Sequence, residues 1–120
     1  MTEARLTLGR SGEEAATRYL SAQGYSIVAR NLRTPVGEID IIAQKSNVLI
    51  FIEVKTRRSF AFGTPQEAVG ARKQRQIIRA AQWYLSGSPY RSLQPRFDVI
   101  AILYPPSGPQ IEHIVNAFSL

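Results

Sequence analysis

Cysteine is absent from the 120-residue sequence. This absence excludes disulfide bonds, thiolate metal ligands and a cysteine nucleophile, and it leaves the redox compartment open. Long apolar runs are missing as well, since stretches such as residues 48–52 are far shorter than the roughly 18 residues that a membrane helix requires. The first ten residues contain no apolar segment of the kind found in secretory signals. We therefore expect no membrane span and a cytoplasmic location.

Acidic residues are scarce. Nine acids stand against 15 lysines and arginines, which gives a formal net charge of +6 and a pI of about 10.2. A pI above ~9 is typical of nucleic-acid binders. Between Lys55 and Arg79 the only acid is Glu67, and such a segment is costly unless an anion faces it. A basic protein without such a partner is the alternative. The candidate nucleic-acid-binding residues are Arg57, Arg58, Arg72, Lys73, Arg75 and Arg79.

The length of the chain and its apolar share of 44% suit a single domain that spans residues 1–120. Ser11 and Glu14 have the spacing of a capping box, in which a serine side chain caps a helix and a glutamate three residues later reaches back to it. A first helix is therefore expected from residue 11 to about residue 23. Gly24 supplies the stop signal at its end.

A second helix is expected in the middle of the chain. Residues 64–67 form another capping box, with a proline at the first helical position. Gly70 leaves two alternatives open, because the helix either continues from this box to about Leu85 or restarts near Ala71 after a short turn. Its arginines and Lys73 either track a phosphate backbone or form an ordinary solvated face.

Segments rich in isoleucine, valine and phenylalanine predict strands. They lie at residues 25–32, 38–44, 48–56, 97–104 and 111–117. The order of elements is then α-β-β-β-α-β-β. This order implies an α/β protein with a mixed central β-sheet flanked by helices.

Two of these strands place charged side chains together. Side chains of a strand alternate between its faces, so Glu38 and Asp40 share one face, as do Glu53 and Lys55. If residues 46–47 form a two-residue turn, Asp40 lies opposite Glu53 and Glu38 lies opposite Lys55. Opposed residues have Cβ atoms roughly 4.5–5.5 Å apart. The hairpin of residues 37–58 therefore brings two carboxyls and a lysine to one point.

Like charges directly opposed destabilise a sheet, and a divalent cation between them reverses this effect. Mg²⁺ prefers oxygen ligands, takes one or two carboxylates and completes its shell with water and phosphate. Lys55 would then reach the attacking water or the phosphate. The alternative is a solvated polar face on which Lys55 pairs with Glu38. We favour the first interpretation, a metal-dependent nuclease site.

Four ordered motifs also carry a family resemblance: GRSGE at 9–13, GEIDIIA at 37–43, FIEVKTR at 51–57 and RFDV at 96–99. With them the chain resembles the YraN family of uncharacterised bacterial proteins over nearly its whole length. Asp40 followed by Glu53-x-Lys55 resembles the PD-(D/E)xK nucleases of restriction-endonuclease-like fold, and the family is similar to archaeal Holliday-junction resolvases. One departure is that Ile39, not proline, precedes Asp40.

The resemblance implies a role for each matching residue. Asp40 and Glu53 would be ligands of Mg²⁺ or Mn²⁺, and Lys55 would stabilise charge or orient the water. Glu13 would be a further acid near the metal; from the residues alone, an interaction with the helix dipole is an equal alternative. A homodimer is implied as well, because resolvases cut two strands symmetrically.

Other polar and aromatic residues receive simpler interpretations. Asp98, beside Arg96, is expected to be a structural hydrogen-bond acceptor, and the single histidine, His113, is expected to be structural. Trp83 is expected in the core. The aromatic residues at 60 and 62 would stack on unpaired bases or pack in the core or at a dimer contact. Glu38 is either a further ligand or the partner of Lys55.

Three functions therefore compete. The first is a Mg²⁺-dependent endonuclease that hydrolyses phosphodiesters of DNA, branched or junction DNA included. The second is a catalytically inactive nucleic-acid-binding module with the same fold, motivated by the basic stretch from Lys55 to Arg79. The third, a structural or protein-interaction domain, leaves the charge and the opposed carboxyls unexplained. No base-reading motif is visible, so we expect recognition of substrate shape over sequence.

Overall fold

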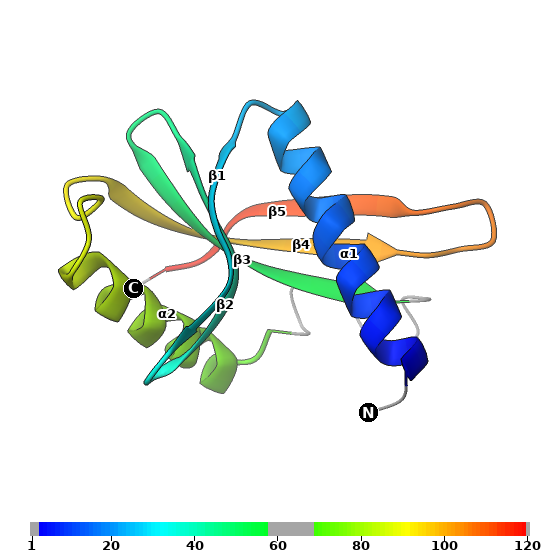
Figure 1. Ribbon diagram of the computed structural model, residues 1–120, viewed down its shortest axis with the longest axis horizontal. Helices are drawn as coiled ribbons and strands as arrows, with labels where there is room; N and C mark the ends of the chain where they lie inside the picture. The colour runs from blue at the N-terminus through cyan, green and yellow to red at the C-terminus, as the bar shows by residue number, and fades with distance from the viewer. Residues whose placement is uncertain (1–2, 58–68, 120) are drawn as a thin grey trace.

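The computed structural model describes residues 3–57 and 69–119, with the side chains of residues 10–57 and 69–119. Within these residues the chain forms two helices and five strands (Figure 1). Their bounds are α1 Glu3–Ala22, β1 Ser26–Thr34, β2 Gly37–Lys45, β3 Val48–Arg57, α2 Ala71–Ser86, β4 Gln94–Leu103 and β5 Gln110–Phe118. The predicted order of elements is confirmed. Neither of these helices is long and apolar enough to cross a membrane.

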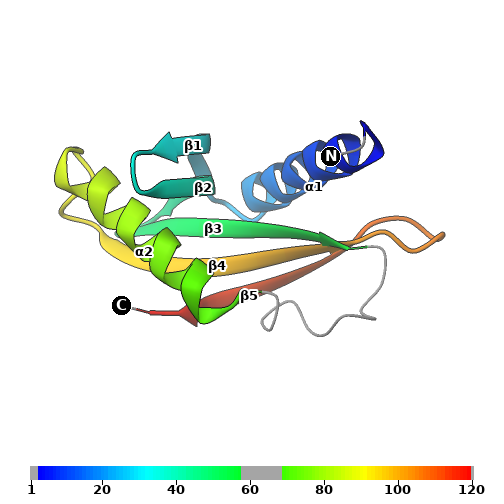
Figure 2. The same ribbon diagram turned by 90° about the horizontal axis from the view of Figure 1, so that it is seen from below.

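The strands form one sheet in the order β1-β2-β3-β4-β5. Strands β3 and β4 pair in parallel, and the other neighbours pair antiparallel. A parallel pair requires a crossover connection, and helix α2 lies in the connection between β3 and β4. Helices α1 and α2 cover opposite faces of the sheet (Figure 2). The prediction of a mixed central sheet flanked by helices is confirmed.

Each face of the sheet has its own apolar core, because side chains alternate along the strands. Under α1, Leu20 packs with isoleucines of β2, β3 and β4. Under α2, Ile77 packs with Phe51 and Phe97, whose rings stack at a centroid distance of 5.6 Å. Phe51, Leu20 and Ile77 are buried. The two cores hold both helices against β3, the strand that carries Glu53 and Lys55.

Helix α1 begins earlier than expected. The predicted capping box at Ser11 is wrong, because the helix starts at Glu3 and Ser11 lies inside it. The hydroxyl of Ser11 contacts the hydroxyl of Tyr104 at 2.9 Å instead of capping the helix. The preceding residues include alanine, arginine and leucine, which favour a helical conformation and extend the helix.

Helix α2 begins at Ala71 with Gly70 at its N-cap, as the second alternative predicted. The capping box predicted at 64–67 and the aromatic residues at 60 and 62 lie outside the described residues.

Helix α1 approaches strand β3 closely at Gly12. A Cβ at this position would overlap the Thr56 side-chain oxygen. Gly12 is buried, and Thr56 follows Lys55 on β3. The missing side chain therefore lets α1 lie directly on the strand that carries the charged residues.

Gly12→Ala is expected to lower the free energy of unfolding by about 1–2 kcal/mol, because overpacking outweighs the helix propensity gained with alanine. The measurement is urea unfolding followed by far-UV circular dichroism. Thr56→Ala removes the hydroxyl oxygen that the new methyl group would overlap, so adding it to Gly12→Ala should restore most of the loss, with Thr56→Ala alone as the reference. A Gly12→Ala protein as stable as the wild type would contradict the close approach.

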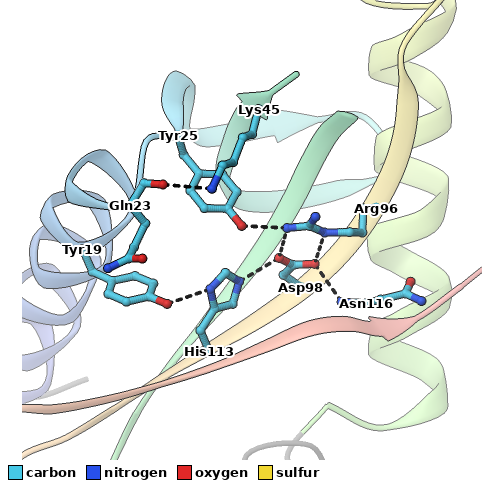
Figure 3. A network of polar contacts seen from close by, with 8 residues as sticks. All are labelled: Tyr19, Gln23, Tyr25, Lys45, Arg96, Asp98, His113 and Asn116. Atoms are coloured by element: carbon cyan, nitrogen blue, oxygen red, sulfur yellow. Dashed lines mark hydrogen bonds and ion pairs between the residues drawn. The ribbon is translucent and has the colours of Figure 1, made fainter. Parts of the chain in front are cut away.

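A buried polar network lies on the α1 side of the sheet (Figure 3). The Asp98 side chain is fully buried and accepts from Arg96 Nε at 2.9 Å, Arg96 Nη2 at 2.8 Å and His113 Nε2 at 2.7 Å. The backbone N–H of Asn116, a residue with a positive φ of 55°, donates to the same carboxylate at 2.9 Å. The structural roles predicted for Asp98 and His113 are confirmed.

The network extends to α1 and to Tyr25, the residue before β1. The Tyr19 hydroxyl lies 3.0 Å from His113 Nδ1, and Arg96 donates to the Tyr25 hydroxyl at 2.9 Å. An ionised carboxylate only accepts, so His113 Nε2 carries the hydrogen that points at Asp98. The network thus ties α1, β4 and β5 together with Tyr25, in the connection between α1 and β1.

Trp83 corrects another prediction. Its side chain is 49% exposed and does not belong to the core. The buried residues of α2 are Ile77, Ala80 and Ala81. Helical geometry places Trp83 at the flank of the buried side, because position 83 falls in line with the exposed Arg72 and lies roughly 120° around the helix from Ile77.

Candidate functional site

The β2–β3 hairpin has the predicted register near its turn. Lys45 pairs with Val48, and the pairing continues to Ile41 opposite Ile52. Ser46 in the turn has a positive φ of 54°, as hairpin turns of two residues require. The prediction of a two-residue turn is confirmed.

The regular ladder ends just before the predicted acidic pair. The pairs between β2 and β3 stop at Ile41 and Ile52, so Asp40 and Glu53 are not a regular cross-strand pair. The Asp40 carboxylate instead accepts a hydrogen bond of 2.8 Å from the backbone N–H of Val54. A regular pair would force two like charges together, and the opened ladder gives one carboxyl a backbone donor. The two carboxyls still lie close enough for each to affect the pKa of the other.

Two lysines face Glu53, whose side chain is only 7% exposed. Lys55 Nζ lies 3.4 Å from Glu53 Oε1, and Lys73 Nζ lies 3.8 Å from the same oxygen. Lys55 comes from β3 itself and Lys73 from the first turn of α2. The sequence suggested phosphate tracking for Lys73, and the structure places it at the carboxyl pair. A contact between residues 20 positions apart left no local signal in the sequence.

Glu38 does not pair with Lys55, so this prediction is wrong. Glu38 Oε1 lies 3.6 Å from Arg33 Nε, and both side chains are mostly exposed. Arg33 is the β1 neighbour of Glu38 in the sheet. The reason is the opened ladder, because β2 and β3 are no longer paired where Glu38 would meet Lys55.

Burial raises the pKa of Glu53 to about 7, and repulsion from Asp40 adds to this rise, while Lys73 and Lys55 oppose it. Burial also raises the pKa of Asp40, against the hydrogen bond from Val54 and the charge of Lys73. Desolvation therefore outweighs the two lysines at both carboxyls. A protonated Glu53 carboxyl can donate to Asp40, and a cation can replace that proton.

Glu13 reaches this site from α1. Burial raises the pKa of its carboxyl, a hydrogen bond with the Asn31 side chain opposes this, and repulsion from Asp40 raises it further. Asn31 lies beside Asp40 in the β1–β2 pair and has a positive φ of 50°. Sequence reasoning missed Asn31; the only signal is that asparagine tolerates this backbone conformation better than most residues. A shallow hollow bordered by Asn31 and Asp40 opens on this side.

The donor set suits a hard divalent cation. Asp40 and Glu53 offer oxygen atoms, and one or two carboxylates are what Mg²⁺ usually takes from a protein. In the part of the chain that the structure describes, no group of three or more histidine, cysteine or acidic side chains is placed to hold a metal ion. Asp40 and Glu53 are thus the pair that would hold Mg²⁺, with Glu13 at the edge.

The described arginines predicted to bind nucleic acid lie along α2 and at the end of β3. Arg72, Arg75 and Arg79 are exposed on α2. Arg57 is half-buried at the end of β3 and contacts the carbonyl of Thr56 at 3.4 Å. Arg58 lies outside the described residues. The three exposed arginines of this set therefore lie along α2, whose first turn contacts the carboxyl pair through Lys73.

A comparison with models of protein families identifies the family of this chain. The model of the uncharacterised protein family UPF0102 matches residues 12–102, which include Glu13, Asp40, Glu53, Lys55 and Lys73. The chain belongs to the UPF0102 family. The predicted membership of this family of uncharacterised bacterial proteins is confirmed.

Similar UPF0102 proteins occur in distant bacteria. One from Syntrophotalea carbinolica is 57% identical over all of this chain and 98% of its own length. Another, from Caldanaerobacter subterraneus subsp. tengcongensis, is 45% identical over 93% of this chain and 94% of its own. Among solved structures, "Crystal structure of SSO0001" matches with 17% identity and a TM-score of 0.41, over 98% of this chain and 54% of that one.

Proposed function

We propose that this UPF0102 protein is a divalent-metal-dependent endonuclease that hydrolyses phosphodiester bonds of DNA. The supporting observation is that the half-buried carboxyl of Asp40 lies beside the buried carboxyl of Glu53, with two lysine ammonium groups at Glu53. Burying two carboxyls side by side costs stability unless a cation or a proton lies between them. The net charge of +6 supplies attraction for the phosphate backbone.

Each residue has a role in this proposal. Asp40 and Glu53 would hold Mg²⁺ or Mn²⁺, and Glu13 would lie on the Asp40 side. A bound Mg²⁺ polarises the phosphate and lowers the pKa of water. Lys55, 3.4 Å from Glu53, would contact a phosphate oxygen and orient the attacking water. Water adds to phosphorus, the P–O ester bond breaks, and the products are a phosphate monoester and an alcohol.

The resemblance to PD-(D/E)xK nuclease motifs extends the proposal to substrate and assembly. Branched or junction DNA would be the substrate. A two-fold dimer would present two such sites for symmetric cutting of two strands. Sedimentation of the protein at micromolar concentration measures the dimer directly.

The structure also favours a second candidate, a nucleic-acid-binding module without turnover. Lys55 and Lys73 both contact Glu53, so the site has partial charge compensation from the chain itself. In this case no divalent metal binds, and DNA affinity is unchanged or higher when Asp40 is neutralised. The two candidates thus differ in metal binding before any substrate is known.

The test is calorimetric titration of Mg²⁺ and Mn²⁺ into the wild type and Asp40→Asn, with cleavage of a labelled four-way junction in parallel. We expect the wild type to bind metal and cleave, and Asp40→Asn to lose metal binding and more than about 100-fold in cleavage rate. Glu14→Gln is the matched control, since Glu14 is exposed and pairs with Arg18 in its own helix.

Metal binding without cleavage of junction, flapped, nicked or linear DNA would contradict the nuclease. Absence of metal binding in the wild type would favour the binding module. Equal cleavage by Asp40→Asn would show that the carboxyl pair is not the active site.

A further inference from the structure

The exposed side of helix α2 carries a row of aligned side chains that ends in Trp83. Arg72, Gln76, Arg79 and Trp83 are spaced by four, three and four residues, so they lie above one another along the helix. All four are exposed. The side of the helix that carries Ile77 and Ala81 is buried against the sheet. We call these four residues the α2 row.

The α2 row has the chemistry of a nucleic-acid contact. Helix α2 contains no acidic residue, and Arg75 lies beside the row. Arginine forks match phosphate oxygens, and an indole ring stacks on any base. An indole left 49% exposed keeps much of its apolar surface in water, and a stacked base would cover this surface. Arginine and tryptophan together therefore favour a strand with unpaired bases over an acidic protein surface.

The row leads away from the carboxyl pair. Lys73, the neighbour of Arg72, lies 3.8 Å from Glu53, so the first turn of α2 is at the candidate site. Trp83 is ten residues further along the helix, which corresponds to about 15 Å at a rise of 1.5 Å per residue. This length spans roughly four stacked nucleotides at 3.4 Å each. Figure 2 shows α2 running across its face of the sheet.

We propose that the α2 row binds a single-stranded segment of DNA and that Trp83 stacks on an unpaired base roughly four nucleotides from the scissile phosphate. The distance to a scissile phosphate rests on the proposed nuclease function, whereas strand binding and stacking do not. The substrate class is accordingly DNA in which a duplex adjoins unpaired nucleotides. Arg72 and Arg79 hold the backbone between the two points.

Trp83 is the only tryptophan of the chain, so intrinsic fluorescence reports on this one residue. The experiment titrates a labelled 12-nucleotide oligothymidine, and a blunt duplex of equal length, into the full chain with EDTA present. Anisotropy of the label gives affinity and tryptophan emission gives stacking. We expect the single strand to quench the emission and the duplex to leave it nearly unchanged.

The matched variants separate stacking from charge. Trp83→Ala should weaken single-strand binding roughly tenfold or more, and Trp83→Phe should keep most of the affinity. Arg79→Ala should lower the salt dependence of binding by about one counterion. Gln82→Ala, exposed on the same helix but outside the row, should change nothing.

Three results would overturn the inference. In the first, the oligonucleotide binds with unchanged emission and equal affinity for Trp83→Ala. In the second, polyglutamate displaces the labelled oligothymidine as effectively as unlabelled DNA does, which would mean that the helix binds any polyanion. In the third, the emission shifts with protein concentration alone, so that a second copy covers Trp83. Because EDTA removes metal from the assay, strand binding can succeed or fail independently of cleavage.

Discussion

Asp98→Ala is expected to lower the free energy of unfolding by about 3–5 kcal/mol, the loss typical of breaking a buried ion pair from one side. The carboxylate accepts hydrogen bonds from Arg96, His113 and the backbone of Asn116. Alanine leaves these buried donors without their acceptor. Burial alone would raise the pKa of Asp98, and the hydrogen bonds of His113, Arg96 and Asn116 lower it overall. The ionised carboxylate is therefore the form that the fold stabilises.

Urea unfolding at pH 7 measures this loss. Glu14→Ala is the matched control, because it also removes a carboxylate, but from an exposed pair with Arg18, and such pairs contribute at most ~1 kcal/mol. Because the pKa of Asp98 is lowered in the folded protein, the carboxylate stabilises the fold at pH values above the usual aspartate pKa. This contribution is lost as the pH falls through the pKa of Asp98 in the folded protein. A loss below 1 kcal/mol for Asp98→Ala would contradict the structural role of the network.

The stability of the wild type is expected to decrease as the pH rises from about 4.5 to about 7. Burial raises the pKa of Glu53 from 4.5 to about 7, so between these values the folded protein holds a proton that the unfolded chain has released. Since the state that binds more protons is favoured at low pH, folding weakens as the pH rises. The loss should level off above pH 7 at roughly 1–3 kcal/mol.

Glu53→Gln removes the titrating group and keeps the shape of the side chain. The variant should be more stable than the wild type at pH 8, and its stability should depend less on pH. The raised pKa of Asp40 leaves part of the pH dependence in place. Urea unfolding at four values from pH 5 to pH 8, in EDTA, measures both. If the site holds a cation, Mg²⁺ at pH 8 stabilises the wild type and not the variant. Parallel pH profiles for both proteins would contradict the raised pKa.

Local patterns in the sequence were sufficient for the order of elements and for the hairpin. A two-residue turn at positions 46–47 and a period of two along both strands place Ile41 opposite Ile52. The same alternation puts Asp40 near Glu53 without any knowledge of the rest of the fold. These features depend on neighbours along the chain, so the sequence contains them directly.

Local patterns failed where a distant partner competes. Ser11 has the spacing of a helix cap, yet the helix continues through it and its hydroxyl meets Tyr104, 93 residues away. Trp83 was expected in the core, but its position around α2 leaves its side chain 49% exposed. Hydrophobicity of a single residue does not say which side of a helix it occupies.

The α/β order, the basic charge and the proximity of Asp40, Glu53 and Lys55 follow from composition, strand alternation and one short turn. The opening of the ladder at Asp40, the contact of Lys73 with Glu53 and the pairing of Glu38 with Arg33 depend on the folded arrangement of distant segments. These contacts arise from packing α2 on the sheet and from relieving two opposed carboxyls. Neither of these effects is encoded by any one segment of the chain.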